Sequence, residues 1–274
     1  MPRSVALVKW TWPRVALLAA VLVYLGGLLV LPLGALATQT AGSGFASLLS
    51  DLSSPDALHA LFVSLVLAAI AAVVNGVVGV AAAIVFVRHR FVGRRVLDAV
   101  ADMPLTVSPV MVGLAFLLIF GRDGYLAPML EILDFKVTFA FAGLVIATLF
   151  VTLPFTLREV SYVLEELGTE EEEAAAILGG SAWQTFRLVT LPNIRHALAY
   201  GITLTVARSL GEFGAVLILG GAISGKTQTA TTFINVAMEE RREPAAYGMA
   251  LVLAVASIAL LLVLEALKKV KEKA

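Results

Sequence analysis

The sequence predicts an all-α polytopic membrane protein with six transmembrane helices. Of its 274 residues, 59% are hydrophobic and 15% are charged, and the mean hydropathy is +0.94. A soluble domain of this length carries roughly 25% charged residues. Apolar runs of about 18 residues or more, long enough to cross a bilayer as a helix, recur along the chain. We therefore expect a multi-pass protein of the cell membrane.

The composition also limits the chemistry that this chain is expected to perform. It has no cysteine, which excludes disulfides, Cys-ligated zinc and a thiol nucleophile. Its three histidines, His59, His89 and His196, are scattered, and no H-E-x-x-H motif or carboxylate cluster accompanies them. We expect no metal site and no catalytic residues, so the chain is not expected to be an enzyme. The net charge of zero gives no indication of a nucleic-acid partner, and none is expected.

Residues 1–56 are expected to form an N-terminal arm, the first transmembrane helix and an external loop. The apolar run at 13–37 follows three basic residues, and its end at 35–37, Ala-Leu-Ala, resembles a signal-peptide cleavage site. Its apolar core exceeds the roughly 7–15 residues of a signal peptide. An uncleaved transmembrane helix is therefore favoured over a cleaved leader.

Five further apolar runs predict the other transmembrane helices, at about 57–87, 104–120, 137–157, 194–221 and 244–267. In the first of these runs, small residues recur every four positions at Ala68, Ala72 and Gly76, which predicts close packing against neighbouring helices. Asn75 is expected to hydrogen-bond to a neighbouring helix. Pro154 is expected to kink the end of the fourth span.

The distribution of Lys and Arg predicts that both termini lie in the cytoplasm. Six spans place the two termini on the same side of the membrane. Fourteen of the 20 Lys and Arg residues lie on one predicted side, in the N-terminal arm, the 88–95 loop, the 158–193 segment with its flank, and the basic tail at 268–274. Five lie in the other three loops, and Arg208 lies within the fifth predicted span. Cytoplasmic loops carry the excess of positive charge. The 158–193 segment and the tail are therefore expected in the cytoplasm.

The longest polar interruption between the spans is residues 169–192, called the polar hairpin below. Two residue pairs have the capping-box spacing of a helix N-terminus, Thr169 with Glu172 and Ser181 with Gln184. Gly179 permits the positive φ of a tight reversal, and Pro192 is expected to end the second helix. Two short helices joined by a sharp turn and held between two membrane spans predict a docking surface.

The polar hairpin resembles the EAA motif of type I ABC importer permeases, which reads E-A-A, three residues, G, nine residues, I-x-L-P. The one departure is Val189 in place of Ile. In that family the segment is the coupling helix, which sits in a groove of an ATPase subunit. The resemblance implies the ATPase-coupling residues Glu173, Ala174, Ala175, Gly179, Val189, Leu191 and Pro192. Trp183 is expected beneath the hairpin more than at a partner. An amphipathic hairpin without a partner is the alternative.

Further segments resemble the CysW type of permease subunit found in sulfate/thiosulfate importers. They are 102–114, 150–160, 190–195 and 207–216, within a similarity that covers about residues 58–265. The resemblance implies the type I ABC importer permease (MetI-like) fold, with 57–267 as its core and 158–193 as its cytoplasmic coupling segment. Molybdate/tungstate permeases share the Gly-Glu-Phe-Gly sequence of 211–214, so a permease of that kind is the alternative.

Arg208 and Glu212 are the clearest ionisable residues inside a predicted span, and an intramembrane charge marks a functional site by default. Residues four apart on a helix are able to pair, and an unpaired carboxylate beside an anion path would repel the substrate. A structural or gating ion pair is therefore favoured over anion binding by Arg208. The pathway or gate candidates are Arg208, Gly211, Glu212, Phe213, Gly214 and Ser108.

Residues 220–227, GGAISGKT, match the P-loop pattern but are expected to be a chance match. A P-loop follows a β-strand, opens a helix and has access to ATP. This segment follows a membrane span and lies on the predicted outer side. Lys226, Thr227 and Gln228 are still candidates to face a binding protein or the incoming anion.

The resemblance implies several partners: a second permease subunit in a heterodimer, two cytoplasmic ATPase subunits, an external substrate-binding protein and membrane lipid. No cofactor is expected on this chain, because ATP and Mg²⁺ would be used by the partner ATPase. An ion-coupled secondary transporter is the alternative from another class. It would have several intramembrane titratable groups and no coupling segment, unlike this sequence.

Overall fold

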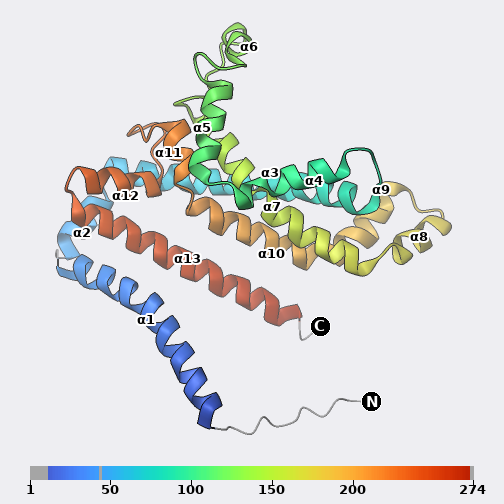
Figure 1. The fold of residues 1–274 in the computed structure, drawn as a ribbon, viewed down its shortest axis with the longest axis horizontal. Helices are drawn as coiled ribbons and strands as arrows, with labels where there is room; N and C mark the ends of the chain where they lie inside the picture. Colours follow the sequence, from blue (N-terminus) through green and yellow to red (C-terminus); the bar gives the residue numbers. More distant parts are fainter. Residues whose placement is uncertain (1–11, 43–44, 272–274) are drawn as a thin grey trace.

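Three helices cross at the centre of the molecule: α3 (Pro55–Arg88), α7 (Phe141–Leu167) and α10 (Leu191–Leu210). The computed structural model describes residues 12–42 and 45–271, and this part of the chain contains helices but no β-strand. The arm before Trp12 and the last three residues of the tail lie outside the described residues. The other elements are α1 (Trp12–Gly42), α2 (Phe45–Leu52), α4 (Arg94–Thr106), α5 (Pro109–Phe120), α6 (Ala127–Ile132), α8 (Glu170–Ile177), α9 (Ala182–Thr185), the π-helical η1 (Phe186–Thr190), α11 (Gly214–Gly220), α12 (Ala230–Glu239) and α13 (Glu243–Lys271), arranged as in Figure 1.

Glycines allow the three central helices to approach one another closely around Thr156 of α7. A Cβ on Gly79 of α3 would lie 3.1 Å from the Thr156 Cβ, and one on Gly201 of α10 would lie 2.8 Å from the Thr156 Cα. The Thr156 hydroxyl also hydrogen-bonds to that of Thr205 on α10, at 3.0 Å. Small residues thus let polar and van der Waals contacts form between helices, as expected in an apolar surrounding.

Asn75 joins α3 to α7, which confirms the predicted hydrogen bond to a neighbouring helix. Its side-chain amide donates to the backbone carbonyl of Leu149 at 3.0 Å and to the Thr152 hydroxyl at 2.8 Å. Thr152 in turn donates to the carbonyl of Thr148 at 2.7 Å. Because Asn75 is 2% exposed, these bonds satisfy a polar group that would otherwise be costly to bury.

Among the described residues, four helices are long and apolar enough to span a membrane: Val15–Thr40, Pro55–Arg88, Phe141–Leu167 and Glu243–Leu260. Two further spans arise if each of two bent helix pairs crosses the membrane as a unit. The fourth predicted span extends beyond its expected end, since α7 continues through Pro154 to Leu167. Part of the 158–193 segment therefore belongs to a long helix.

The third predicted span, 104–120, is wrong as a continuous helix. It is formed by the end of α4 and by α5, and the α4 and α5 axes are bent by 119°. The residue before a proline is disfavoured in the α region, and Ser108, which precedes Pro109, has φ −59° and ψ 135°. The apolar run looks uninterrupted because hydropathy does not register this backbone restriction.

The fifth predicted span, 194–221, is also broken, with a bend of 56° between α10 and α11. At the break, the Glu212 carboxylate accepts a hydrogen bond from the backbone N–H of Ala215 at 3.1 Å. The backbone carbonyl of Glu212 accepts from the Thr231 hydroxyl at 2.6 Å. Side chains thus satisfy backbone groups that a continuous helix would pair internally.

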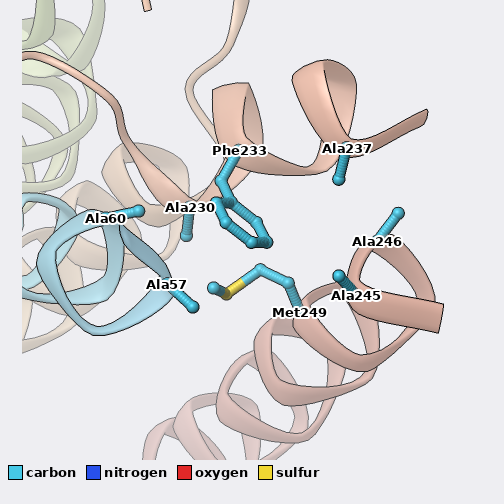
Figure 2. Close-up of a cluster of buried hydrophobic side chains, with 8 residues drawn as sticks. All are labelled: Ala57, Ala60, Ala230, Phe233, Ala237, Ala245, Ala246 and Met249. Carbon is cyan, nitrogen blue, oxygen red and sulfur yellow. The ribbon is translucent and has the colours of Figure 1, made fainter. Parts of the chain in front are cut away.

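The predicted loop at 222–243 contains an additional helix, α12. A reciprocal capping box between Thr229 and Thr232 starts this helix. Its apolar face packs with α3 and α13 in a buried cluster that Figure 2 shows, made of Ala57, Ala60, Ala230, Phe233, Ala237, Ala245, Ala246 and Met249. In Figure 1 this cluster lies toward the left and the polar hairpin toward the right, so the two occupy opposite ends of the molecule.

Candidate functional site

The polar hairpin folds as α8, a tight turn, α9 and η1. Gly179 in the turn has φ +85°, the conformation that the sequence predicts for a reversal. The capping box of Ser181 with Gln184 is confirmed, with bonds of 3.3 and 2.8 Å. The capping box of Thr169 with Glu172 is wrong. The Thr169 hydroxyl instead donates to Glu173 at 2.6 Å, because Glu172 is engaged with Arg88.

Pro192 does not end the second helix of the hairpin. Residues 182–210 form one helical run, in which Pro192 occupies the first turn of α10 directly after η1. A proline inside a helix lacks the N–H donor and clashes with the preceding turn. The wider π-helical turn, closed by the bond from the Leu191 N–H to the Phe186 carbonyl, relieves this constraint. The hairpin is therefore directly continuous with a central helix.

The tip of the hairpin exposes large apolar side chains. Ile177, Leu178 and Leu188 are exposed, and so is Trp183, at 67%. The expectation that Trp183 packs beneath the hairpin is wrong. Phe186 takes that place, packing on the buried cluster of α3, α7 and α10, while the Trp183 ring lies against it at 5.6 Å between centroids.

The seven predicted coupling residues lie on this one hairpin with different exposures. Glu173, Ala174, Gly179 and Pro192 are exposed, whereas Ala175, Val189 and Leu191 are half-buried. A Cβ added to Gly179 would meet nothing within 4 Å. Leu191 packs on the buried cluster at the end of α3. The motif thus supplies an outer face and an inner, anchoring face.

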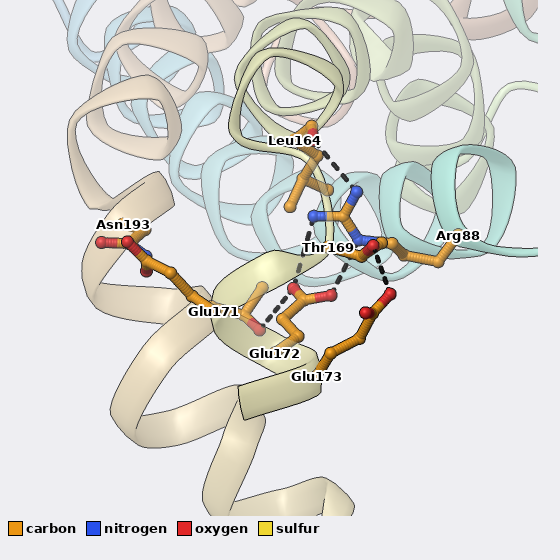
Figure 3. Close-up of polar contacts among 8 residues, drawn as sticks. Arg88, Leu164, Thr169, Glu171, Glu172, Glu173 and Asn193 are labelled. Atoms are coloured by element: carbon orange, nitrogen blue, oxygen red, sulfur yellow. Dashed lines mark hydrogen bonds and ion pairs between the residues drawn. The ribbon is translucent and has the colours of Figure 1, made fainter. Parts of the chain in front are cut away.

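The anchoring of the hairpin includes contacts that sequence reasoning missed. Arg88, at the end of α3, forms an ion pair with Glu172 of α8 at 2.8 Å and donates to the backbone carbonyl of Leu164 in α7 at 3.0 Å (Figure 3). Thr190 of η1 donates to the same Glu172 carboxylate at 2.9 Å. Arg88 and Glu172 are 84 residues apart, so no local pattern relates them.

Arg208 and Glu212 form the predicted ion pair, with 2.8 Å between Nη1 and Oε2. The two residues do not share a continuous helical face, because α10 ends at Leu210 and Glu212 lies in the break before α11. Glu212 is 2% exposed, whereas the Arg208 side chain is 31% exposed. The buried carboxylate is thus neutralised by an arginine whose other face remains accessible.

The two broken spans meet close to their breaks. A Cβ on Gly214, which starts α11, would lie 2.9 Å from Val110 Cγ2 and 3.3 Å from Pro109 Cβ at the start of α5. Gly214 therefore serves close packing, whereas a Cβ on Gly211 would make only ordinary contacts, the nearest at 3.8 Å. Ser108, directly before Pro109, and Phe213 are exposed. The structure thus brings the break at 107–108 near the break at 211–213.

The P-loop match at 220–227 has no preceding β-strand; it follows α11. The Thr227 hydroxyl donates to the Gly220 carbonyl at 2.6 Å and accepts from the Ile223 N–H at 3.1 Å. Thr227 and Gln228 are each 2% exposed, so neither side chain presents itself at the surface to a binding protein. Lys226 is exposed.

The family model and the similar proteins agree on one family for this chain. Residues 75–274 match the family described as binding-protein-dependent transport system inner membrane component. The chain is 41% identical over 252 residues to the sulfate transport system permease protein CysW of Synechococcus elongatus, covering 92% of this chain and 88% of the relative. It is 40% identical over 234 residues to the sulfate transport system permease protein CysT of Escherichia coli K12, covering 85% and 84%.

A solved structure has the same fold. It is a bacterial alginate ABC transporter in complex with an alginate pentasaccharide-bound periplasmic protein, similar to this chain with a TM-score of 0.76 over 92% of each chain. The identity is 16%, so this similarity concerns the fold alone. The predicted all-α type I ABC importer permease (MetI-like) fold is confirmed. The chain is a multi-pass membrane protein, and it belongs to the family of binding-protein-dependent transport system inner membrane components.

Proposed function

We propose that this chain is a membrane-embedded permease subunit of an ATP-driven sulfate importer. Two relatives that it matches over most of its length, at 41% and 40% identity, are both named sulfate transport system permease proteins. These relatives are permeases and not enzymes, and in this proposal ATP and Mg²⁺ are used by a separate ATPase subunit. Thiosulfate is the second anion that the proposal includes.

The polar hairpin is proposed as the docking site for the ATPase. The observation that carries this assignment is the exposed tip, where Ile177, Leu178 and Trp183 present apolar side chains to the outside. Exposed apolar patches mark interaction sites, and Trp is enriched among the residues that carry most of the binding energy at an interface. Glu173, Ala174 and Gly179 flank this tip on the exposed side. In this proposal the hairpin and both termini lie in the cytoplasm, as the Lys and Arg distribution predicts.

The breaks at 107–108 and 211–213 are proposed to face the translocation pathway. Non-helical backbone at membrane depth is tolerated where it is buried in protein or lines a water-filled cavity. Arg208, paired with Glu212 and one-third exposed, places an ion pair without net charge beside this region, where it serves as a structural or gating pair. ATP binding would shift the protein between inward-open and outward-open states by stabilising one of them.

The partners in this proposal are a second permease, two ATPase subunits and an external binding protein. The two relatives carry the names of two different permeases, CysW and CysT, which supports a heterodimer over a homodimer. The external binding protein would deliver the anion at the end of the molecule that carries α2 and α12 (Figure 1).

Uptake by the reconstituted complex tests the substrate. Vesicles containing the chain with its second permease and ATPase, supplied with the external binding protein, are expected to accumulate labelled sulfate only with internal ATP. Thiosulfate should compete with sulfate, and molybdate and tungstate should not. ATP-dependent uptake of molybdate in preference to sulfate would contradict the substrate, and sulfate uptake driven by an ion gradient alone would contradict the whole assignment.

A further inference from the structure

Three consecutive glutamates of α8 face three different partners. Because successive residues of an α-helix point about 100° apart, Glu171, Glu172 and Glu173 cannot share one face. Glu171 accepts from the Asn193 side chain and Glu173 from the Thr169 hydroxyl, and both are exposed. Glu172 alone turns inward, toward Arg88 (Figure 3). The acidic run is therefore divided into an outer part and an inner part.

The inner part joins the hairpin to the three central helices. Glu172 binds Arg88 of α3 and Thr190, which leads directly into α10, while Arg88 also binds the Leu164 carbonyl of α7. The Arg88 and Glu172 side chains are only 12% and 23% exposed, so solvent screens this pair less than a surface pair. The small gap between these elements, lined by Arg88, Leu164 and Glu172 among others, holds about 10 Å³, so the elements pack closely around the ion pair.

We propose that Arg88 and Glu172 form a clamp that makes the polar hairpin and the inner end of α3 move as one body, so that ATPase movement reaches the membrane helices. This inference rests on the proposed function, and it assigns Arg88 and Glu172 as positioning residues. In this role they hold the hairpin in place without themselves contacting the ATPase or the anion. Arginine suits this role because its planar fork donates to a carboxylate and a carbonyl at once.

Neighbouring glutamates provide a matched test of the clamp. Glu172→Gln and Glu170→Gln remove the same charge from the first turn of α8, but Glu170 is exposed and has no ion-pair partner among the described residues. In the reconstituted complex, Glu172→Gln is expected to lower sulfate-stimulated ATP hydrolysis roughly tenfold, in line with couplings carried by networks of contacts. Glu170→Gln should change it little. Both variants should bind the ATPase at wild-type levels, because the docking face is intact.

Two further variants separate the clamp from a general loss of folding. Arg88→Gln combined with Glu172→Gln should be no worse than the more harmful single change, since both remove one interaction. Thr190→Val keeps the side-chain volume and removes only the hydroxyl bond to Glu172, so a smaller loss is expected. Strictly additive losses, or a Glu172→Gln variant that behaves as Glu170→Gln does, would overturn the clamp.

The absence of native cysteines permits a direct measurement of movement. Spin labels at Glu170→Cys and Arg90→Cys, both exposed positions, report the distance between α8 and the residues after α3. This distance should stay the same with and without ATP in the otherwise unchanged chain and should become ATP-dependent when Glu172→Gln is added. An ATP-dependent distance in the unchanged chain would contradict the clamp. Failure of the ATPase to bind the wild-type chain would instead contradict the proposed function itself.

Discussion

Three arginines of this molecule pair with carboxylates. Arg208 pairs with Glu212, Arg88 with Glu172, and Arg158 of α7 with Asp98 and Asp102 of α4, at 2.8 and 2.6 Å. Removing a charge from water is costly, and an opposite charge with further hydrogen bonds offsets much of that cost. Each arginine thereby fixes the relative position of two segments as well as neutralising a carboxylate.

Neutralising Arg208 is expected to do more harm than neutralising Glu212. Arg208→Gln leaves a carboxylate that is 2% exposed without its counter-ion, whereas Glu212→Gln leaves an arginine that still reaches water. The double variant should be milder than the sum of the single variants by about 0.5–3 kcal/mol, the usual range for contacting residues. Thermal unfolding of the purified variants, together with sulfate uptake, measures this difference. Additive effects of the two changes would exclude an energetically important pair.

At the scale of elements, the two broken spans are the features that hydropathy did not predict. Their apolar composition predicts membrane segments, and each bent pair is apolar enough to be one span if it crosses as a unit. The α4–α5 bend follows from Pro109 acting on Ser108, which the sequence contains but which an apolar run conceals. The break at 211–213 depends on bonds from Ala215 and Thr231, the latter 19 residues away on α12, which no local pattern specifies.

The contact between α5 and α11 gives a prediction about Gly214. Gly214→Val would place its side chain against Val110 and Pro109, and overpacking of this kind costs about 1–3 kcal/mol. Gly211→Ala is the matched control, because the nearest atoms to its Cβ would lie at 3.8 Å and its φ of −92° suits alanine. The thermal midpoint in detergent should fall for the first variant and not for the second. Equal midpoints for both would show that α5 can move away from α11 without cost.

At the scale of the whole molecule, the sequence predicted the class of fold and the two short helices and tight turn of the polar hairpin. The hairpin was recognisable because the spacing from Glu173 to Pro192 is local to one segment. The attachment of the hairpin to the central helices was not recognisable from the sequence, since Arg88 reaches Glu172 only when folding has brought α3 and α8 together. The exposure of Trp183 was also missed, because an aromatic side chain suits a core and an interface equally well.

In the proposed function, energy enters this chain through the polar hairpin from a separate ATPase. Gly179 offers a direct test, because its surroundings are open in the chain itself and its φ is +85°. Gly179→Asn controls for the backbone, since asparagine tolerates positive φ better than most residues. Gly179→Trp adds bulk on the side proposed to meet the ATPase, and because a bulky residue is strained at this φ, thermal unfolding of both variants checks that the fold is kept.

Sulfate-stimulated ATP hydrolysis by the reconstituted complex is the measurement that tests whether the ATPase acts through the polar hairpin. Gly179→Trp is expected to reduce it about tenfold or more, equivalent to about 1.4 kcal/mol of lost coupling or docking. Gly179→Asn should remain near the wild-type rate, and both variants should insert into the membrane normally. If Gly179→Trp stimulates hydrolysis as well as the wild-type chain does, the hairpin is not the site at which the ATPase drives transport.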